Sequence, residues 1–391
     1  MANITIAREG RLSFPRFLRG ILTIAGTTIG AGMLGVPLVT ADAGFWPAFL
    51  VNFGVWIFVL CTGLLYAEVT LWMPEGTNIL STAHRFLGTR GKILIGGLFL
   101  FLYYCLMVAY FAAGAPILSS FFSKILGVSM EGWVSNLVFG VVFSAIVSFG
   151  SKWMSRMYFL VTIAMVGTYL ILVGTGSSEV QMDRLISLNV PSFLFVIPVL
   201  FSAIGYHHVI PSLHSYLGGE RKALRLSVFF GTTIPLFIFV IWQWVVLGSL
   251  PKQAQALHAA NDKAWMFEVG QYFAFFVIVT SMLGVAFSLV DFFSVTLKTS
   301  KFKIKMPMVV FATFFPPFVI AGIQPALFDQ ALGIAGGFGE AFLNGLIPPF
   351  LVWMGHKASH RSSLGGKLYL GILLLLSLFV IGLEAYYLVF R

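Results

Sequence analysis

The stretch that decides the fold is Gly26-Thr27-Thr28-Ile29-Gly30-Ala31-Gly32-Met33-Leu34-Gly35-Val36-Pro37. It lies inside the apolar segment 17–41, which is long enough to cross a bilayer. Its four glycines, two threonines and one proline are poorly suited to an uninterrupted helix. Irregular backbone survives at membrane depth only where it faces protein or water, because unpaired peptide groups are costly in hydrocarbon. The stretch therefore predicts either a helix break that offers N–H and C=O groups to a ligand, or close helix packing through Gly26 and Gly30.

The composition is typical of a membrane protein. Hydrophobic residues make up 59% and charged residues 10% of the 391 residues, against about half and about a quarter in soluble domains. The chain has 24 Lys and Arg against 14 Asp and Glu, and we interpret this excess first as a topology signal, not as nucleic-acid binding. Cys61 and Cys105 lie in separate apolar runs, so they indicate neither a disulfide framework nor a metal site. No cofactor is expected.

Eleven apolar spans with short connections predict one membrane domain over 1–391 and no soluble module. With the N-terminus in the cytoplasm, nineteen of the 24 basic residues lie on the cytoplasmic side. The pattern predicts a cytoplasmic N-terminus and an external C-terminus. The basic residues then left outside are Lys124, Arg184, Lys252, Lys263 and Arg391. The expected spans are 17–41, 45–72, 93–122, 133–149, 154–174, 192–216, 224–248, 266–297, 307–322, 327–354 and 366–390.

The spans also predict an internal repeat. The halves 17–174 and 192–354 hold five spans each over roughly 160 residues, and 366–390 is an extra helix. An odd number of spans per half inserts the second half upside down, so a 5+5 inverted repeat requires the sixth span to be broken like the first. That span contains Gly205-Tyr206-His207-His208 and Pro211, which are costly in a membrane helix without a function. Paired interruptions predict the binding site of a secondary transporter; two independently kinked helices are the alternative.

These motifs also carry a family resemblance. Gly26 to Leu34, followed by Pro37 and by Ala43-Gly44-Phe45-Trp46-Pro47, resembles the first helix of the hydroxy/aromatic amino acid permeases. Gly205-Tyr206-His207 with Pro211-Ser212-Leu213 is similar to the sixth-helix motif of that family, in which a small residue often stands where this chain has His208. The resemblance is to the tyrosine and tryptophan permeases of the amino acid–polyamine–organocation superfamily. It implies an all-α, leucine-transporter-like fold with discontinuous helices 1 and 6, and proton-coupled import of tyrosine or tryptophan across the bacterial cytoplasmic (inner) membrane.

A zwitterionic amino acid suits two broken helices. Half-helix N-termini offer N–H groups to its carboxylate, and half-helix C-termini offer carbonyls to its ammonium group. Glycine at the breaks lets the ligand approach the backbone, and an apolar pocket with a few polar groups would take the side chain. The expected substrate-binding residues are Thr27, Thr28, Gly30, Ala31, Gly32, Tyr104, Met107, Tyr110, Ser202, Ala203, Gly205, Tyr206, His207, Ser281 and Gly284, with Tyr103 as a further candidate.

Ionisable residues inside the spans suggest the coupling ion. His207 lies at the sixth-span break, and Glu340 lies deep in a glycine-rich span. Lys152 and Arg156 open the fifth span, where related folds hold sodium, so a cation there would favour proton coupling; both are otherwise positive-inside anchors. His207, Glu340, Lys152 and Arg156 are therefore the proton-coupling candidates. Water is expected to solvate the remaining acidic residues, which lie nearer the span ends: Glu68, Glu268, Asp291 and Glu384.

Two other classes of protein were weighed. An intramembrane enzyme could use His207, His208 and the buried acids, but the chain has no His-Glu-x-x-His motif. A channel or receptor gives no reason for two matched helix breaks. No Walker motif is present, so direct ATP hydrolysis is not expected. The sequence favours a secondary amino acid transporter that binds its substrate and coupling ion within the lipid bilayer, and not an enzyme.

Overall fold

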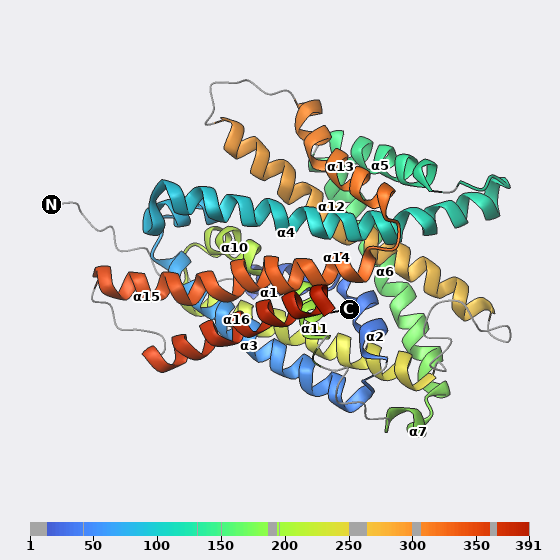
Figure 1. Cartoon of the computed structure of the whole chain (residues 1–391), viewed down its shortest axis with the longest axis horizontal. Helices are drawn as coiled ribbons and strands as arrows, with labels where there is room; N and C mark the ends of the chain where they lie inside the picture. The colour runs from blue at the N-terminus through green and yellow to red at the C-terminus, as the bar shows by residue number, and fades with distance from the viewer. Residues whose placement is uncertain are drawn as a thin grey trace.

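The computed structural model describes residues 14–41, 43–130, 132–149, 151–186, 194, 196–249, 264–298, 306–359 and 366–390. These residues form helices and connecting turns, and no strand occurs among them. Most of the long helices run roughly along the longest axis of the molecule (Figure 1). The predicted all-α fold class is therefore confirmed for the described part of the chain.

Helices cover each of the eleven predicted spans. The first half contains α1 (Phe14–Thr28), α2 (Gly32–Thr40), α3 (Phe45–Leu71), α4 (Ile79–Leu126), α5 (Trp133–Ser148) and α6 (Ser151–Gly176). Two short elements, η1 (Ser177–Glu179) and α7 (Met182–Leu185), follow α6. The second half contains α9 (Val196–Ala203), η2 (His207–Val209), α10 (Ile210–Tyr216), α11 (Arg221–Ser249), α12 (Ala264–Lys298), α13 (Met306–Ile323), α14 (Phe328–Ile334), the π-helical η4 (Ala335–Leu346), α15 (Ile347–Ser359) and α16 (Lys367–Phe390).

Length and apolarity qualify a smaller number of helices as membrane spans. Within the described residues, eight helices are long and apolar enough to cross a membrane, and the bent pair α1–α2 makes a ninth. Helix α5 has 16 residues and falls short of that test, and the span predicted over 327–354 is divided among α14, η4 and α15. The count of eleven spans stays a prediction.

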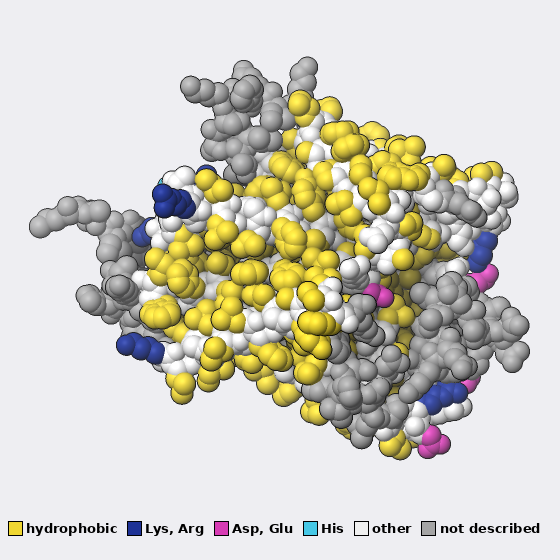
Figure 2. Space-filling view, viewed as in Figure 1, with side chains coloured by type: hydrophobic (Ala, Val, Ile, Leu, Met, Phe, Trp, Pro, Cys, Tyr) yellow, Lys and Arg dark blue, Asp and Glu magenta, His cyan; other side chains and the backbone are white. Residues whose placement is uncertain are grey.

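The surface of the molecule agrees with a bilayer environment. Hydrophobic side chains cover the long middle of the face shown in Figure 2, and most of the charged side chains lie toward its two ends, with one acidic side chain inside the hydrophobic part. Helix α6 shows the pattern clearly, since Phe159, Leu160 and Ile163 on it are more than half exposed. Exposed apolar rows on long helices are favourable in hydrocarbon, and charged groups are favourable where water begins.

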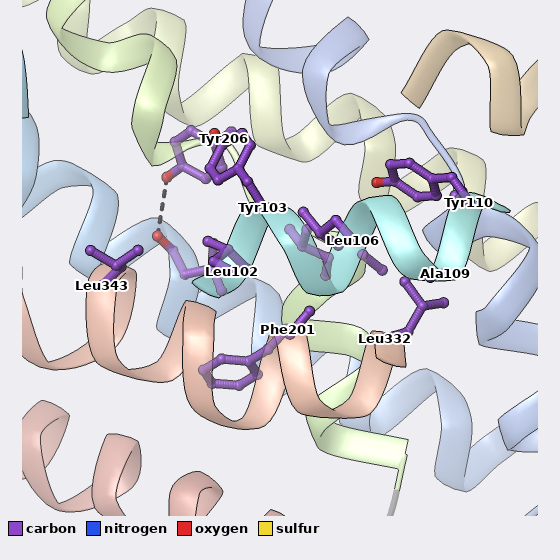
Figure 3. Packing of buried hydrophobic residues seen from close by; sticks show 14 of the residues in the cluster. Leu102, Tyr103, Leu106, Ala109, Tyr110, Phe201, Tyr206, Leu332 and Leu343 are labelled. Carbon is purple, nitrogen blue, oxygen red and sulfur yellow. Dashed lines mark hydrogen bonds between the residues drawn. The ribbon is translucent and has the colours of Figure 1, made fainter. Parts of the chain in front are cut away.

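The two broken helices lie at the centre of the packing. Helix α1 packs on α11, α2 packs on α9, and α9 packs on η4. Helix α4 passes alongside, with α5 and α13 on one side and α14 on the other (Figure 1). Leu102 and Leu106 of α4, Phe201 of α9, and Leu332 and Leu343 of the α14–η4 segment form the buried apolar contacts that hold these elements together (Figure 3).

Two acidic residues that were expected to meet water are buried. Glu68 is 6% exposed and forms ion pairs with Arg221 at 2.7 Å and Arg225 at 2.9 Å. Glu384 is 2% exposed and packs against a helix. The expectation of solvation was therefore wrong for both, because neighbouring helices cover these span ends. Glu268 and Asp291 are exposed, as expected.

Candidate functional site

The first break lies between α1 and α2, whose axes differ by 51°. The amide N–H of Ala31 donates to Ser281 Oγ on α12 at 2.7 Å, which satisfies a donor that the α2 N-terminus leaves free. Gly30 is buried beside the same hydroxyl, which occupies the space that a Cβ atom would need. The glycine thus lets the backbone of the break approach α12 closely.

Helix α2 is attached to α11 through a backbone group that Pro37 leaves without a partner. Proline has no N–H, so the carbonyl of Met33, four residues earlier, loses its helical hydrogen bond. Trp242 supplies the missing donor, because its indole N–H donates to that carbonyl at 2.8 Å. The next residue of α11, Gln243, donates to Thr40 Oγ1 at 3.1 Å and accepts from Asn52 of α3. All three of these side chains are fully buried. The α2 half of the first span is therefore held by two neighbouring helices.

The second break lies between α9 and η2, at residues 204–206. The carboxyl group of Glu340 packs against Gly205 and fills the space that a Cβ atom at this position would need. The two breaks also touch each other, since Gly32 at the start of α2 lies against the backbone and Cβ of Ala203 at the end of α9. Three chain segments far apart in sequence therefore meet at one point.

Glu340 reaches that point because η4 is wide and rich in glycine. Gly336 lies directly against the carbonyl of Pro198 and the amide of Ser202, so η4 and α9 pack backbone to backbone. Glu340 is 6% exposed, and the side-chain amide of Asn344 donates to its Oε2. π-Helical turns are rare and recur at functional sites. This one places a buried carboxyl group at the second break.

Tyr206 and His207 connect the second break to α3. Tyr206 is fully buried, and its hydroxyl donates to the carbonyl of Val59 at 3.0 Å (dashed in Figure 3). His207 Nε2 lies 3.0 Å from Thr62 Oγ1, and the ring stacks on Tyr206 with centroids 4.7 Å apart. Among the described atoms His207 Nδ1 has no hydrogen-bond partner. The histidine is thus buried and attached to α3 through one of its two nitrogens.

Two tyrosines of α4 form a wall opposite α12. Tyr103 and Tyr110 are buried and lie on the same side of α4 in Figure 3. Tyr110 interacts with Ser281, and Tyr103 interacts with Ser288 seven residues further along α12. Gly284, between these two serines, is exposed, and a Cβ atom there would meet nothing within 4 Å. The side of α12 at Gly284 is therefore open, between the Tyr110–Ser281 pair and the Tyr103–Ser288 pair.

Most of the predicted residues gather around the two breaks. Gly30, Ala31, Gly32, Ala203 and Gly205 line them, and Tyr206, His207 and Glu340 surround the second. Met107 is fully buried in the core between Tyr103 and Tyr110. Tyr110 and Ser281 meet beside the first break.

Other predicted residues have local partners. The hydroxyls of Thr27, Thr28 and Ser202 donate to carbonyls of their own helices. Tyr104 turns away and donates to the carbonyl of Ala312 on α13 at 2.7 Å. Arg156 is exposed, and the side chain of Lys152 lies outside the described part of the structure.

Several contributing residues were not predicted. Trp242, Asn344 and Gln243 were missed, and so was Tyr158 of α6, whose hydroxyl donates to the carbonyl of Gly26 at 3.4 Å. Only Trp242 had a usable signal, because a proline inside a helix always frees a carbonyl that needs a donor. Within the described residues, no group of three or more His, Cys, Asp or Glu side chains could hold a metal ion.

Two broken helices that meet inside an apolar helical bundle define a membrane protein with a polar site at its centre. The model of the tryptophan/tyrosine permease family matches residues 14–384, so the chain belongs to that family. It is an amino acid permease with several membrane-spanning helices, and the family excludes the enzyme alternative.

Curated relatives cover nearly the whole chain. The chain is 29% identical to "Tyrosine-specific transport system 1" of Haemophilus influenzae, over 92% of this chain and 93% of the relative. It is 26% identical to "Tryptophan-specific transport protein" of the same organism, again over 92% and 93%. It is also 26% identical to "Glutamine transporter 2" of Aliivibrio fischeri, over 92% of this chain and 97% of the relative.

Proposed function

We propose that this permease imports tyrosine, tryptophan or both across the bacterial inner membrane together with protons, and that the substrate binds where the two broken helices meet. The observation behind the proposal is the convergence of Gly32, Ala203 and Gly205 with the carboxyl group of Glu340. Broken helices free backbone donors and acceptors, and such groups can bind both ends of a zwitterion.

The first break would bind the carboxylate of the substrate. The α2 N-terminus presents the amides of Gly30, Ala31 and Gly32, and helix N-termini favour anions. The Ala31 amide now donates to Ser281, so an arriving carboxylate would replace that hydroxyl as acceptor. The carbonyls at the ends of α1 and α9, near Thr27 and Ser202–Ala203, would accept from the ammonium group.

The aromatic side chain would lie between α4 and α12. Tyr110, Met107 and Gly284 would supply an apolar wall with a hydroxyl at its edge, and a Cβ atom at Gly284 would meet nothing within 4 Å. Relatives named for tyrosine and for tryptophan support an aromatic substrate, whereas the relative named for glutamine makes glutamine the competitor to test.

Glu340 is the proton carrier that we favour, with His207 as the second candidate. A carboxyl group buried in contact with Gly205 responds directly to any change at the second break. Its charged form is costly at membrane depth unless a cation pairs with it, and the substrate ammonium group is such a cation. His207 already has one nitrogen engaged with Thr62. Lys152 and Arg156 stay candidates for excluding sodium, with positive-inside anchoring as the alternative.

The finer architecture belongs to the same proposal. We propose eleven spans arranged as a 5+5 inverted repeat with one extra helix, a cytoplasmic N-terminus and an external C-terminus. Two broken helices, one in each half, support the repeat. Nineteen of the 24 basic residues on one side support the orientation.

Uptake into proteoliposomes tests the function. Purified protein would be supplied with radiolabelled tyrosine, tryptophan, phenylalanine or glutamine, with a proton or a sodium gradient imposed separately. We expect tyrosine or tryptophan to accumulate with the proton gradient alone. Accumulation driven by sodium at constant pH would refute proton coupling, and accumulation of glutamine without tyrosine or tryptophan would refute the substrate class.

A further inference from the structure

Helix α16 contains a buried acidic residue that the proposed function does not use. Glu384 is 2% exposed, and its Oε1 atom is buried without a hydrogen-bond partner among the described atoms. A carboxylate in such a place is more costly than a neutral carboxyl group, because no described partner compensates Oε1 for its lost hydration.

Glu384 fits against α14 and η4 because two glycines leave space for it. A Cβ atom at Gly333 would lie 3.0 Å from Glu384 Oε1, and Gly337 is even closer to the stem of the same side chain. Further along the two helices, Ser377 Oγ lies 2.7 Å from the position of a Cβ atom at Gly345. Helix α16 therefore packs antiparallel along the α14–η4 segment, with Ser377 near one end of the seam and Glu384 near the other.

The α14–η4 segment has a buried carboxyl group on each of two sides. Glu340 projects from it toward Gly205 of the second break, while Glu384 of α16 packs on Gly333 and Gly337. The segment packs on α9 on the one side and on α16 on the other. Whatever moves α16 along this seam therefore acts on the element that positions Glu340.

No described cation faces Glu384. The other acidic groups on the packed elements are Asp329, at the start of α14, and Glu340, and both are unable to neutralise it. Helix α9 (Val196–Ala203) has no titratable side chain. Lys367 lies at the other end of α16, and the phenols of α16 are Tyr369, Tyr386 and Tyr387. The side chains of His356 and Lys357 of α15 lie outside the described part of the structure. A proton is therefore the ligand that fits this carboxyl group.

We propose that Glu384 is a second proton-binding site, separate from the transport site, whose neutral form holds α16 on the α14–η4 segment and whose ionised form releases it. Because that segment positions Glu340, release of α16 slows the transport cycle without changing how many protons accompany the substrate. A neutral group is needed for docking, so raising the pH at this end of α16 favours release.

Counterflow of radiolabelled tyrosine, with equal pH on both sides of the vesicle, tests the proposal because no gradient drives it. We expect exchange by the unmodified protein to slow as pH rises, by at most about tenfold per pH unit for one titrating group. The transport site contributes the same pH dependence to both proteins, so the ratio of exchange by Glu384→Gln to exchange by the unmodified protein should rise with pH, and Glu384→Asp should follow the unmodified protein. A ratio that is constant with pH would overturn the proposal.

A disulfide across the seam provides the second test, for the case in which the Gln variant does not fold. Gly345→Cys and Ser377→Cys would be combined in a background in which Cys61 and Cys105 are replaced by Ser; the Cβ atoms at the two positions would lie 3.2 Å apart, near the separation in disulfides. Oxidation should give the exchange rate the pH profile of Glu384→Gln, and reduction should restore the pH profile of the unmodified protein. A pH profile that oxidation leaves unchanged would contradict the proposal.

Failure of the proposed function would be seen separately. If tyrosine is not exchanged at all, release of α16 can still be followed by thiol labelling of Ser377→Cys, which is fully buried in the docked state. The rate is compared at each pH with the rate in Glu384→Gln, so that the intrinsic pH dependence of the thiol cancels. We expect the ratio of the two rates to rise with pH; a constant ratio would contradict release.

Discussion

The two helix breaks are held in different ways. At the first break, side chains of three other helices bind backbone groups: Ser281 accepts from Ala31, Trp242 donates to Met33, and Tyr158 donates to Gly26. At the second break the contacts run through side chains, with His207 bound to Thr62 and the carboxyl group of Glu340 against Gly205.

The difference separates two tasks. All contacts at the first break are neutral, so its geometry is indifferent to pH and suits the constant task of presenting amides to a carboxylate. The second break has two buried titratable groups beside it, so its geometry depends on whether a proton is bound. We infer that the first break recognises substrate and that the second couples recognition to the proton.

The largest effect is expected from removal of the titratable carboxyl group of Glu340. Glu340→Gln should abolish uptake against a gradient, because the proton can no longer be carried, while counterflow of tyrosine continues. Glu268→Gln is the matched control, since its exposed carboxyl group pairs with Lys124 on the surface. If Glu340→Gln still accumulates tyrosine, the division of tasks is wrong.

The second test moves the two breaks apart. Gly32→Ala places a methyl group against the backbone of Ala203, which cannot give way as a flexible side chain would. We expect uptake to fall by more than about tenfold, in line with an overpacking cost of about 1–3 kcal/mol. Gly26→Ala on α1 is the control, because a Cβ atom there meets nothing within 4 Å. Equal uptake by the two variants would show that contact between the breaks is unimportant.

A third test addresses only the first break. Trp242→Phe leaves the Met33 carbonyl buried without a donor, which costs about 1–3 kcal/mol, so we expect apparent affinity for tyrosine to fall by about tenfold. Pro37→Ala restores a backbone N–H for the same carbonyl. The loss caused by Trp242→Phe should therefore be much smaller in the Pro37→Ala background. Equal losses in both backgrounds would mean that the tryptophan acts through packing alone.

The smallest effect is expected at Tyr206. Tyr206→Phe removes the hydrogen bond to the Val59 carbonyl, which already belongs to helix α3, so stability should fall by about 0.5–1.5 kcal/mol. Thermal unfolding in detergent would show a small decrease in midpoint, with tyrosine uptake close to that of the unmodified protein. Loss of transport without loss of stability would give this hydroxyl a role in binding.

Much of the site could be predicted because its residues conflict with their surroundings. Gly30, Gly32 and Gly205 are poor helix formers inside spans, and Glu340 is ionisable inside one, so the sequence favoured a functional reason for their presence over helix packing. Tyr103, Met107 and Tyr110 follow the i, i+4, i+7 spacing of one helix face, and Tyr104 falls off that face. The same periodicity explains why Tyr104 contacts α13 instead of the site.

The remaining contacts could not be assigned from the sequence. Trp242 and Tyr158 are ordinary residues of long apolar helices, and each acts through one contact that depends on how two helices are rotated about their axes; Pro37 indicates that a donor is needed but not which residue supplies it. Asn344 lies four residues after Glu340 in the same segment, η4, and its contact depends on the π-helical winding, which the sequence did not predict. Glu384 illustrates the same difficulty. Its position near a span end predicted contact with water, whereas the glycines of another helix create the space that buries it.

The π-helical form of η4 has a mechanical consequence. Each of its hydrogen-bonded rings encloses one residue more than a ring of an α-helix, so a change from π to α winding turns every later side chain about the helix axis. Glu340 lies in the middle of the twelve residues of η4, between the contacts with α9 and α16. A local change of winding would therefore aim the carboxyl group in a new direction and would rotate the part of the span that follows it.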